Sequence, residues 1–189
     1  MPVYLQIVQG LDPTSAGLHM TPMMLGVFVS SVTSGQIISR IGRYKMFPVL
    51  GTGLMTLGLV FLSRMTLATS AETASVYMLC LGLGLGMVMQ ILVMSVQNAV
   101  AYEQLGVATS GTTLFRSIGG AVGAALFGGI FSFTLHHKLS TSAPQLAEIT
   151  NDPSVIAGLS DTLRATYHTL FVESLRPVFM TASVRSFVS

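Results

Sequence analysis

Three polar residues stand inside long apolar runs of this chain, and they are its best candidates for chemistry within a membrane. Arg116 interrupts an apolar run over residues 108–133. A charge at the centre of a membrane helix costs about 2.5–3.5 kcal/mol on insertion scales, so such a residue usually faces protein or a water-filled path. Gln90 and Gln97 lie in another apolar run, where a buried amide needs a hydrogen-bond partner or water. The sequence therefore predicts a substrate pathway near these three residues. The alternatives are an Arg116 that snorkels to the membrane surface and a Gln97 that is solvated at the membrane edge.

The other reactive side chains do not form a recognisable catalytic or metal-binding pattern. Ser110 precedes an apolar run, but His19, the one histidine in a complete run, falls at the opposite membrane face, so a serine hydrolase pair is not expected. No G-x-S-x-G or phosphate-binding loop occurs. His136, His137 and His168 lack a carboxylate at ligand spacing. The sequence predicts a protein that is not an enzyme, with no cofactor and no metal.

Composition places the chain in a lipid bilayer. Of its 189 residues, 8% are charged and 51% hydrophobic, against roughly 25% charged in a soluble domain. The net charge of +2 is too small for nucleic-acid binding. A membrane helix needs roughly 20 apolar residues, and four segments meet or approach that length. They are residues 17–38, 46–63, 74–97 and 108–133. Residues 166–189 read as the start of a truncated or altered final helix, and the alternative, which Pro177 and the charges of this segment allow, is an interfacial helix.

The connections between these segments predict their orientation. The segment 39–45 carries Arg40, Arg43 and Lys45, and basic residues in short loops stay on the cytoplasmic side. Residues 98–107 then also lie inside, and residues 1–15, 64–73 and 134–165 lie outside. The predicted protein is a multi-pass helical bundle in the plasma or inner membrane.

Glycines at helical spacing predict how the helices pack. Membrane helices associate through small residues that let their backbones approach closely. Gly82 and Gly86 lie four residues apart in the third segment, and Gly119, Gly120 and Gly123 follow Arg116 in the fourth. We expect these glycines to form helix-packing faces.

Three groups of residues resemble the second half of fourteen-helix drug/proton antiporters of the major facilitator superfamily. Residues 4–17 with Pro22 resemble an outer loop and helix start, and residues 106–111 with 115–120 and Gly123 resemble the entry to the penultimate helix. A cytoplasmic loop motif of that superfamily is matched by Gly35, Arg40, Gly42, Arg43 and Lys45. Ser39 stands where a strong copy of this motif has an aspartate, so the charge latch of that acid is not expected here.

The resemblance implies a fold, a substrate class and a coupling ion. The chain would form part of the C-terminal half of such a transporter, with helices ten to thirteen and the start of fourteen. A complete transporter would move small amphipathic or cationic compounds by alternating access in exchange for protons. Proton coupling needs a titratable group in the membrane, and the four predicted spans have no Asp or Glu. Glu173 in the last segment is the one candidate, and the alternative is an ion pair with Arg176, three residues later. Coupling acids would then belong to the missing part.

A second interpretation uses the same residues. A stand-alone small membrane protein would pack its glycine faces between copies and act as an oligomeric or interaction subunit. The number of copies in the purified protein distinguishes it from part of a transporter.

Overall fold

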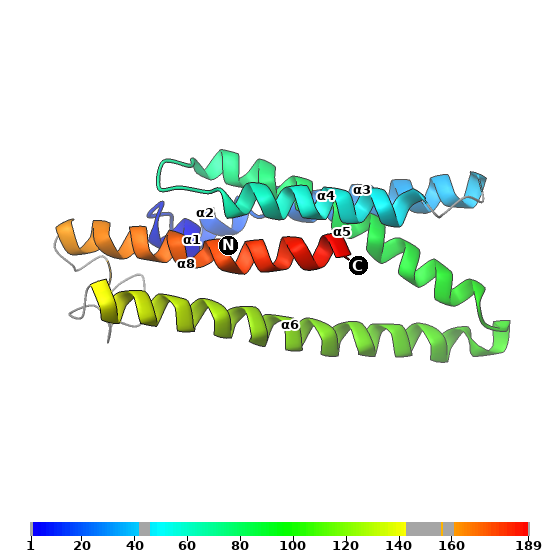
Figure 1. Cartoon of the computed structure of the whole chain (residues 1–189). Coiled ribbons are helices and arrows are strands. Elements are labelled where there is room, and N and C mark those ends of the chain that lie inside the picture. Colours follow the sequence, from blue (N-terminus) through cyan, green and yellow to red (C-terminus); the bar gives the residue numbers. More distant parts are fainter. Residues whose placement is uncertain (1, 42–45, 143–155, 157–160, 189) are drawn as a thin grey trace.

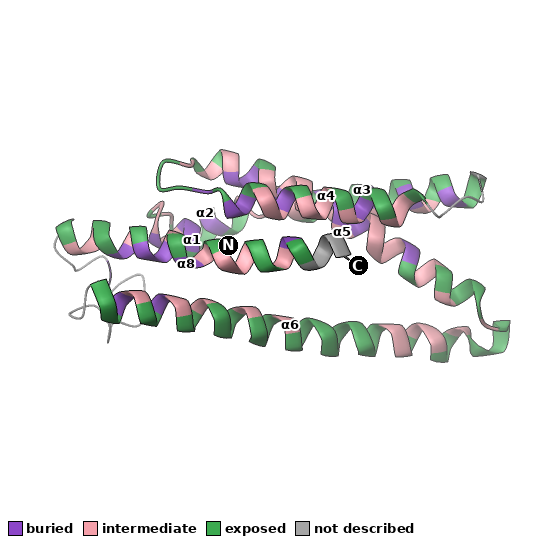
Figure 2. Ribbon diagram, viewed as in Figure 1, coloured by how far each residue is buried: buried purple, intermediate pink, exposed green. Residues whose placement is uncertain are grey.

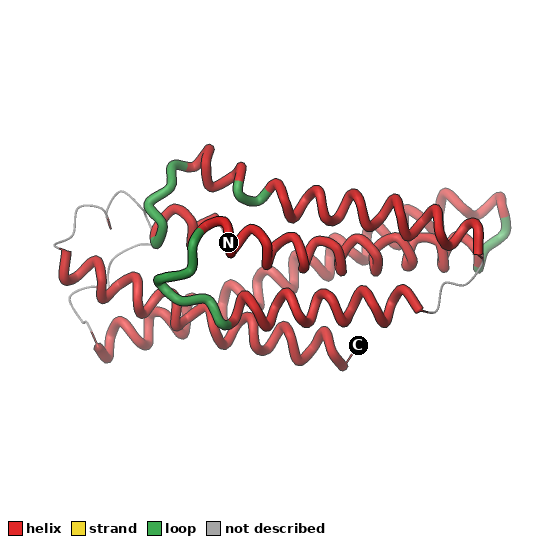
Figure 3. Tube along the Cα trace, turned by 90° about the horizontal axis from the view of Figure 1, so that it is seen from above, coloured by secondary structure: helices red, strands yellow, loops and turns green. Residues whose placement is uncertain are grey.

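A computed structural model describes residues 2–41, 46–142, 156 and 161–188, and the regular elements in these ranges are all helices (Figure 1). In chain order they are α1 (Pro2–Ile7), α2 (Pro13–Leu18), α3 (Thr21–Ile41), α4 (Met46–Ser63), α5 (Ala71–Asn98), the short 3-10 helix η1 (Tyr102–Gln104), α6 (Leu105–Ser142) and α8 (Asp161–Val188). The long helices extend along one common direction, as a second view also shows (Figure 3). The all-α prediction is confirmed.

Four helical stretches are long and apolar enough to cross a membrane. They are Pro13–Arg40, Met46–Ser63, Ala71–Asn98 and Tyr102–Ser142. Helix α8, which contains Pro177 and several charged residues, is not among them. The chain is a multi-pass membrane protein.

Side chains at the helix starts explain where several elements begin. The Asp12 carboxylate accepts hydrogen bonds from the backbone N–H groups of Thr14 and Ser15 at the start of α2. Hydrogen bonds from Ser15, together with that from Thr14, hold the pKa of this carboxyl below its ordinary value. Ser70 caps α5 by accepting from the Thr73 N–H. Gly10 turns the chain between α1 and α2 with a φ of +64°, a conformation that glycine adopts without a steric penalty.

Helix α5 is the centre of the bundle. It packs against α3 on one side and α4 on another, α8 packs on α4, and α6 contacts α8 and, less extensively, α5. Figure 2 shows buried residues along α3, α4 and α5, whereas α6 is exposed over most of its length. The buried residues of α6 are Leu135 and Leu139, near its C-terminal end.

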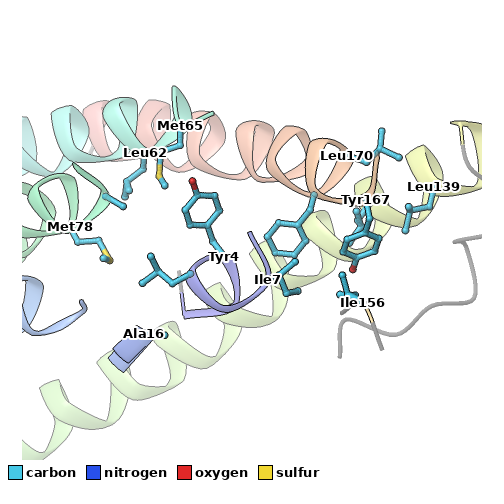
Figure 4. Close-up of a cluster of buried hydrophobic side chains, with 14 residues drawn as sticks. Tyr4, Ile7, Ala16, Leu62, Met65, Met78, Leu139, Ile156, Tyr167 and Leu170 are labelled. Carbon is cyan, nitrogen blue, oxygen red and sulfur yellow. The ribbon is translucent and has the colours of Figure 1, made fainter. Parts of the chain in front are cut away.

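A hydrophobic core joins helices that are distant in the sequence. Tyr4 and Leu5 of α1 are at most 1% exposed and pack with Met78 of α5 and with Tyr167 and Phe171 of α8. Figure 4 shows the Tyr4 ring between α1 and the end of α4. This core ties the N-terminal segment to the end of the bundle where the 64–70 connection lies.

Several boundaries differ from the sequence prediction. The segment expected as an outer connection at residues 1–15 contains α1 and α2, because its apolar residues are buried in the core. The first predicted span, 17–38, is α2 followed by α3, which continues to Ile41, and the third, 74–97, is α5. The fourth, 108–133, is α6, which continues to Ser142 with the Thr134 and Thr141 hydroxyls donating to carbonyls four residues earlier.

The last helix also starts earlier than predicted. We expected it from residue 166, but α8 begins at Asp161 and runs unbroken past Pro177. The aromatic residues in its first half pack into the core, and this burial stabilises the early turns despite their charges.

Candidate functional site

The contact between α3 and α5 places a polar pair in the middle of the apolar bundle. These two helices run in the same direction, and their contacts advance by four residues on each: Gly82 meets the carbonyl of Met23, and Gly86 meets the carbonyl of Val27. A Cβ on either glycine would collide with backbone atoms of α3. The absence of a side chain therefore lets the two backbones approach closely.

Gln90 occupies the next layer of this contact. The Ser31 hydroxyl of α3 donates to Gln90 Oε1 over 3.0 Å, and a Cβ at Gly35 would lie 3.2 Å from Gln90 Nε2. Ser31 fixes the carbonyl end of the amide and leaves its NH2 group with donors. Among the described residues, no acceptor hydrogen-bonds to that NH2 group. Gln90 thus holds a positioned donor, of the kind that orients a polar substrate group.

Arg116 reaches α5 beside this layer. It follows the first residue of α6 by about three turns, roughly 16 Å along the helix, and its Nη1 donates to the sulfur of Met89 over 3.5 Å. Met89 directly precedes Gln90, so the arginine of α6 and the amide of α5 lie at neighbouring levels of the bundle. A thioether is a weak acceptor. In the described part of the chain, the guanidinium has no carboxylate within 4.0 Å.

Gln97 is not part of this group. It lies in the last turns of α5, two turns beyond Gln90, and is exposed. The structure therefore brings two of the three predicted pathway residues, Arg116 and Gln90, to adjacent levels and leaves Gln97 near the end of its helix.

The glycines of α6 face open space. A Cβ at Gly119, Gly120 or Gly123 would meet no atom within 4 Å. Gly119 and Gly123 instead line a cavity of about 640 Å3 with apolar residues of α6 and with Thr181 of α8. These glycines pack no helix among the described residues, because α6 lies beside the bundle and not within it (Figure 1). Their predicted packing role stays a prediction.

The cytoplasmic loop motif is divided between a helix and an undescribed segment. Gly35 lies within α3 against Gln90, and Arg40 is an exposed residue in the last turn of α3. Gly42, Arg43 and Lys45 lie outside the described residues. The connection predicted to begin at residue 39 starts later, because α3 continues to Ile41.

Sequence reasoning missed the contacts that secure the opposite end of the bundle. The Tyr4 hydroxyl donates to the carbonyls of Thr66 at 3.2 Å and Thr69 at 3.4 Å, and Gln9 Nε2 donates to the Thr69 carbonyl at 2.8 Å. Burial raises the pKa of the Tyr4 hydroxyl, with a smaller lowering contribution from Gln9. The one signal in the sequence was the apolar character of the segment that holds Tyr4.

The expected ion pair of Glu173 is also different. The sequence offered Arg176 as a possible partner, but Lys138 of α6 lies 2.7 Å from Glu173 Oε2. Arg176 instead donates from Nε to the carbonyl of Ser63 at 3.4 Å. Helix α6 extends far enough beyond the predicted 133 to bring Lys138 to α8, and this length was not visible in the apolar pattern.

The arrangement provides groups that can bind a polar ligand. It offers an amide donor and a cation between apolar walls, which can hold a polar group of an amphipathic molecule. Among the described residues, no three His, Cys, Asp or Glu side chains converge as they would around a metal ion.

Comparison with known proteins identifies the kind of protein that shares these features. Residues 1–124 match the sequence model of the Major Facilitator Superfamily. An uncharacterized MFS-type transporter of Mycobacterium tuberculosis is 38% identical over 185 residues, which cover 96% of this chain and 27% of that protein. The multidrug transporter protein MdtP of Bacillus subtilis is 35% identical over 134 residues, covering 70% of this chain and 24% of its own length.

A third relative matches a larger part of its own length. The tetracycline resistance determinant of Streptomyces rimosus is 32% identical over 157 residues, covering 82% of this chain and 45% of that protein. The chain spans about a quarter of the length of the first two relatives.

Proposed function

Because this chain belongs to the major facilitator superfamily, we propose that it is part of a transporter that moves small molecules by alternating access. In such transporters two sets of helices rock about a site near the middle of the membrane. The chain supplies helices of one set. The second set belongs to a longer protein or assembly, as the share of the relatives' length covered by this chain supports.

The observation that carries this proposal is Arg116. It lies on a helix that could cross the membrane, donates to a methionine sulfur and has no carboxylate partner among the described residues. Intramembrane charges are costly and mark substrate or ion pathways. The exposed face of α6 beside Arg116 provides the wall on which a substrate and the second set of helices would meet.

The substrate class follows from the walls and the donors. Arg116 and Gln90 supply hydrogen-bond donors, and the neighbouring cavity on α6 is lined mainly by apolar residues. The chain also contains 12 methionines, whose flexible side chains suit the binding of varied amphipathic compounds. The names of two relatives, a multidrug transporter and a tetracycline resistance determinant, support export of such compounds. Recognition of cationic compounds and exchange for protons would require acids. The carboxylates in this chain's candidate spans are Glu72 and Glu103, each at the start of its span, so we expect the rest of a complete transporter to supply the coupling acids.

An efflux assay tests the pathway role of Arg116. Cells that express the chain within its native flanking sequence are loaded with tetracycline, which carries oxyanion and carbonyl groups, and the export rate is followed by fluorescence. We expect Arg116→Gln to lower the rate by about tenfold or more and Arg116→Lys to retain part of it, because the charge is kept. The matched control is Arg64→Gln, which removes an exposed arginine outside the candidate spans.

Two results would contradict the proposal at different levels. An export rate in Arg116→Gln equal to that of the wild type would show that Arg116 is not part of the substrate pathway. Export no faster than in cells without the protein would overturn transport of tetracycline. Collapse of the proton gradient should stop export if protons are the coupling ion.

A stand-alone oligomeric protein is the second candidate, favoured by the open glycine face of α6. A second copy placed on Gly119 and Gly123 would bury that face. Mass measurement of the purified chain in detergent decides between them: a defined homo-oligomer that Gly123→Leu dissociates supports the oligomeric protein.

A further inference from the structure

A second cavity lies apart from Arg116 and Gln90, where α8 crosses the end of α4. Its volume is about 420 Å3. One wall is the turn after α4, residues 65–68, and the other is a face of α8 formed by Thr169, Val172, Glu173 and Arg176. These α8 residues are three or four positions apart, so their side chains share one side of the helix.

Glu173 and Arg176, the two charged residues of this wall, keep hydrogen-bonding groups that have no partner among the described residues. Arg176 donates from Nε to the Ser63 carbonyl at the C-terminal end of α4, where helix carbonyls lack internal partners. A guanidinium has five N–H donors, and in the described residues no carboxylate lies within 4.0 Å of this one. Glu173 accepts from Lys138 at Oε2, and its Oε1 accepts no hydrogen bond from the described residues.

The cavity thus presents a cation and an anion at short range. Side chains three residues apart on a helix have Cβ atoms roughly 5–6 Å apart. A complementary ligand carries an oxyanion for Arg176 and an ammonium for Glu173 Oε1, joined by a short linker. A phosphoethanolamine group has this form, because two carbon atoms connect the phosphate oxygen to the ammonium.

The surroundings of the cavity favour a lipid as the carrier of that group. Met65, Leu67 and Val172 give it an apolar wall. Large apolar side chains are exposed along both helices that lead away from it, among them Leu57 and Phe61 of α4 and Met180 and Val184 of α8. Exposed apolar faces of membrane helices contact acyl chains. Arg176 lies within α8 but contacts Ser63, the last residue of the candidate span α4, and a charged side chain at the end of a span lies at headgroup level.

We propose that this cavity binds the headgroup of a phosphatidylethanolamine molecule, with the phosphate on Arg176 and the ammonium on Glu173. Lys138 holds the other carboxylate oxygen and so orients Glu173 toward the cavity. The acyl chains lie along the exposed sides of α4 and α8. This site is separate from the pathway around Arg116 and does not depend on the transport proposal.

Lipid retention measured by native mass spectrometry tests the site. The purified protein is exchanged into detergent with equal amounts of phosphatidylethanolamine, phosphatidylcholine and phosphatidylglycerol. We expect phosphatidylethanolamine to be retained about fivefold better than the other two, and Arg176→Gln to reduce its retention by about fivefold. Glu173→Gln should remove the preference for ethanolamine over glycerol, because it removes the partner of the ammonium.

Two further variants separate the site from general effects of charge and folding. Arg64→Gln removes an arginine near the same end of α4 that does not line the cavity, and it should leave retention unchanged. Thr169→Phe fills the cavity from an exposed position without removing a charge, and it should lower retention as Arg176→Gln does.

Three outcomes would overturn the proposal. Equal retention of the three lipids by the wild type would exclude recognition of the ammonium. Equal losses in Arg176→Gln and Arg64→Gln would show a general charge effect. Displacement of the lipid by millimolar inorganic phosphate would show that the site recognises free phosphate and not a lipid.

Discussion

At the scale of single residues, the polar side chains of Tyr4 and Gln90 each form hydrogen bonds that join distant parts of the chain. Tyr4 is 1% exposed, and its hydroxyl donates to two carbonyls of the connection between α4 and α5. Gln90 accepts from Ser31 across the α3–α5 contact. A buried polar group without a partner is costly, so each of these residues fixes the position of the element that carries its partner.

Replacing Tyr4 by Phe should lower the free energy of unfolding by about 1 kcal/mol, because the ring stays packed while the hydrogen bonds to Thr66 and Thr69 are lost. Denaturant unfolding in detergent, followed by circular dichroism, measures the change. Tyr102→Phe is the control, since Tyr102 is 86% exposed. Equal effects of the two substitutions would contradict the anchoring role of Tyr4.

The contribution of Tyr4 should also depend on alkaline pH. Burial raises the pKa of its hydroxyl, so the folded state holds this proton more tightly than the unfolded state. The stabilisation is therefore complete below the unfolded pKa of about 10 and is lost as the pH rises through the higher folded pKa. The stability difference between wild type and Tyr4→Phe should shrink above about pH 10, and a constant difference up to pH 11.5 would argue against it.

The Ser31–Gln90 hydrogen bond should appear as a coupling between the two side chains. A double-mutant cycle with Ser31→Ala and Gln90→Leu is expected to give about 0.6 kcal/mol, the average for hydrogen bonds between membrane helices. Unfolding in mixed micelles provides the four free energies. Additive effects would mean that the contact contributes no coupling energy.

At the scale of elements, the α3–α5 contact sets the distance and the register between the two helices. Its layers repeat every four residues on both helices, through Met23 with Gly82 and Val27 with Gly86. Each glycine removes a side chain where the opposite backbone passes. Dispersion contacts between closely approaching helices replace the hydrophobic effect, which gives little driving force within lipid.

Gly86→Ala should therefore destabilise the protein by about 1–3 kcal/mol, because the new methyl group meets the Val27 carbonyl and the Ser30 hydroxyl. Gly53→Ala in α4 is the matched control, since a Cβ there meets nothing within 4 Å and alanine favours the helix. Unfolding free energies in mixed micelles compare the two. Similar stability of both variants would contradict the close packing at Gly86.

At the scale of the whole molecule, α6 is a long helix that buries little of its length against the other described helices. Its first residues follow the turn after α5, and its last turns bury Leu135 and Leu139 in the core beside the Lys138–Glu173 ion pair. Between them, α6 is exposed over most of its length (Figure 2), although Arg116 contacts Met89 of α5 and Gly119 and Gly123 line a cavity together with Thr181 of α8. This open length is where we expect the second set of helices of a transporter to pack.

The Lys138–Glu173 pair should contribute modestly to the joining of α6 and α8. Its side chains are 33% and 52% exposed, so we expect Lys138→Glu to cost up to about 1 kcal/mol, less at high salt. Exchanging both charges, Lys138→Glu with Glu173→Lys, should recover most of that loss. If the double exchange is no more stable than the single variant, the ion pair does not hold the two helices together.

The sequence by itself determined the class of this protein. Apolar runs that meet or approach the length needed to cross a bilayer, with few charged residues, predicted helices that cross a membrane, because transfer into lipid depends on local composition. The resemblance to the major facilitator superfamily was also recognised from the sequence alone. The same local information suggested Gln90 and Arg116 as unusual residues, because a polar side chain in an apolar run needs no tertiary structure to be recognised.

Only the tertiary structure decided which residues meet. Tyr4 reaches carbonyls more than 60 positions away, Glu173 pairs with Lys138 instead of Arg176, and Gly86 faces α3 whereas Gly123 faces a cavity. These outcomes depend on the rotation, length and relative level of each helix. The rotation of a helix about its axis and its position along the bundle depend on its packing against all neighbouring helices. A stripe of small residues in one segment is therefore not enough to predict which residues come into contact.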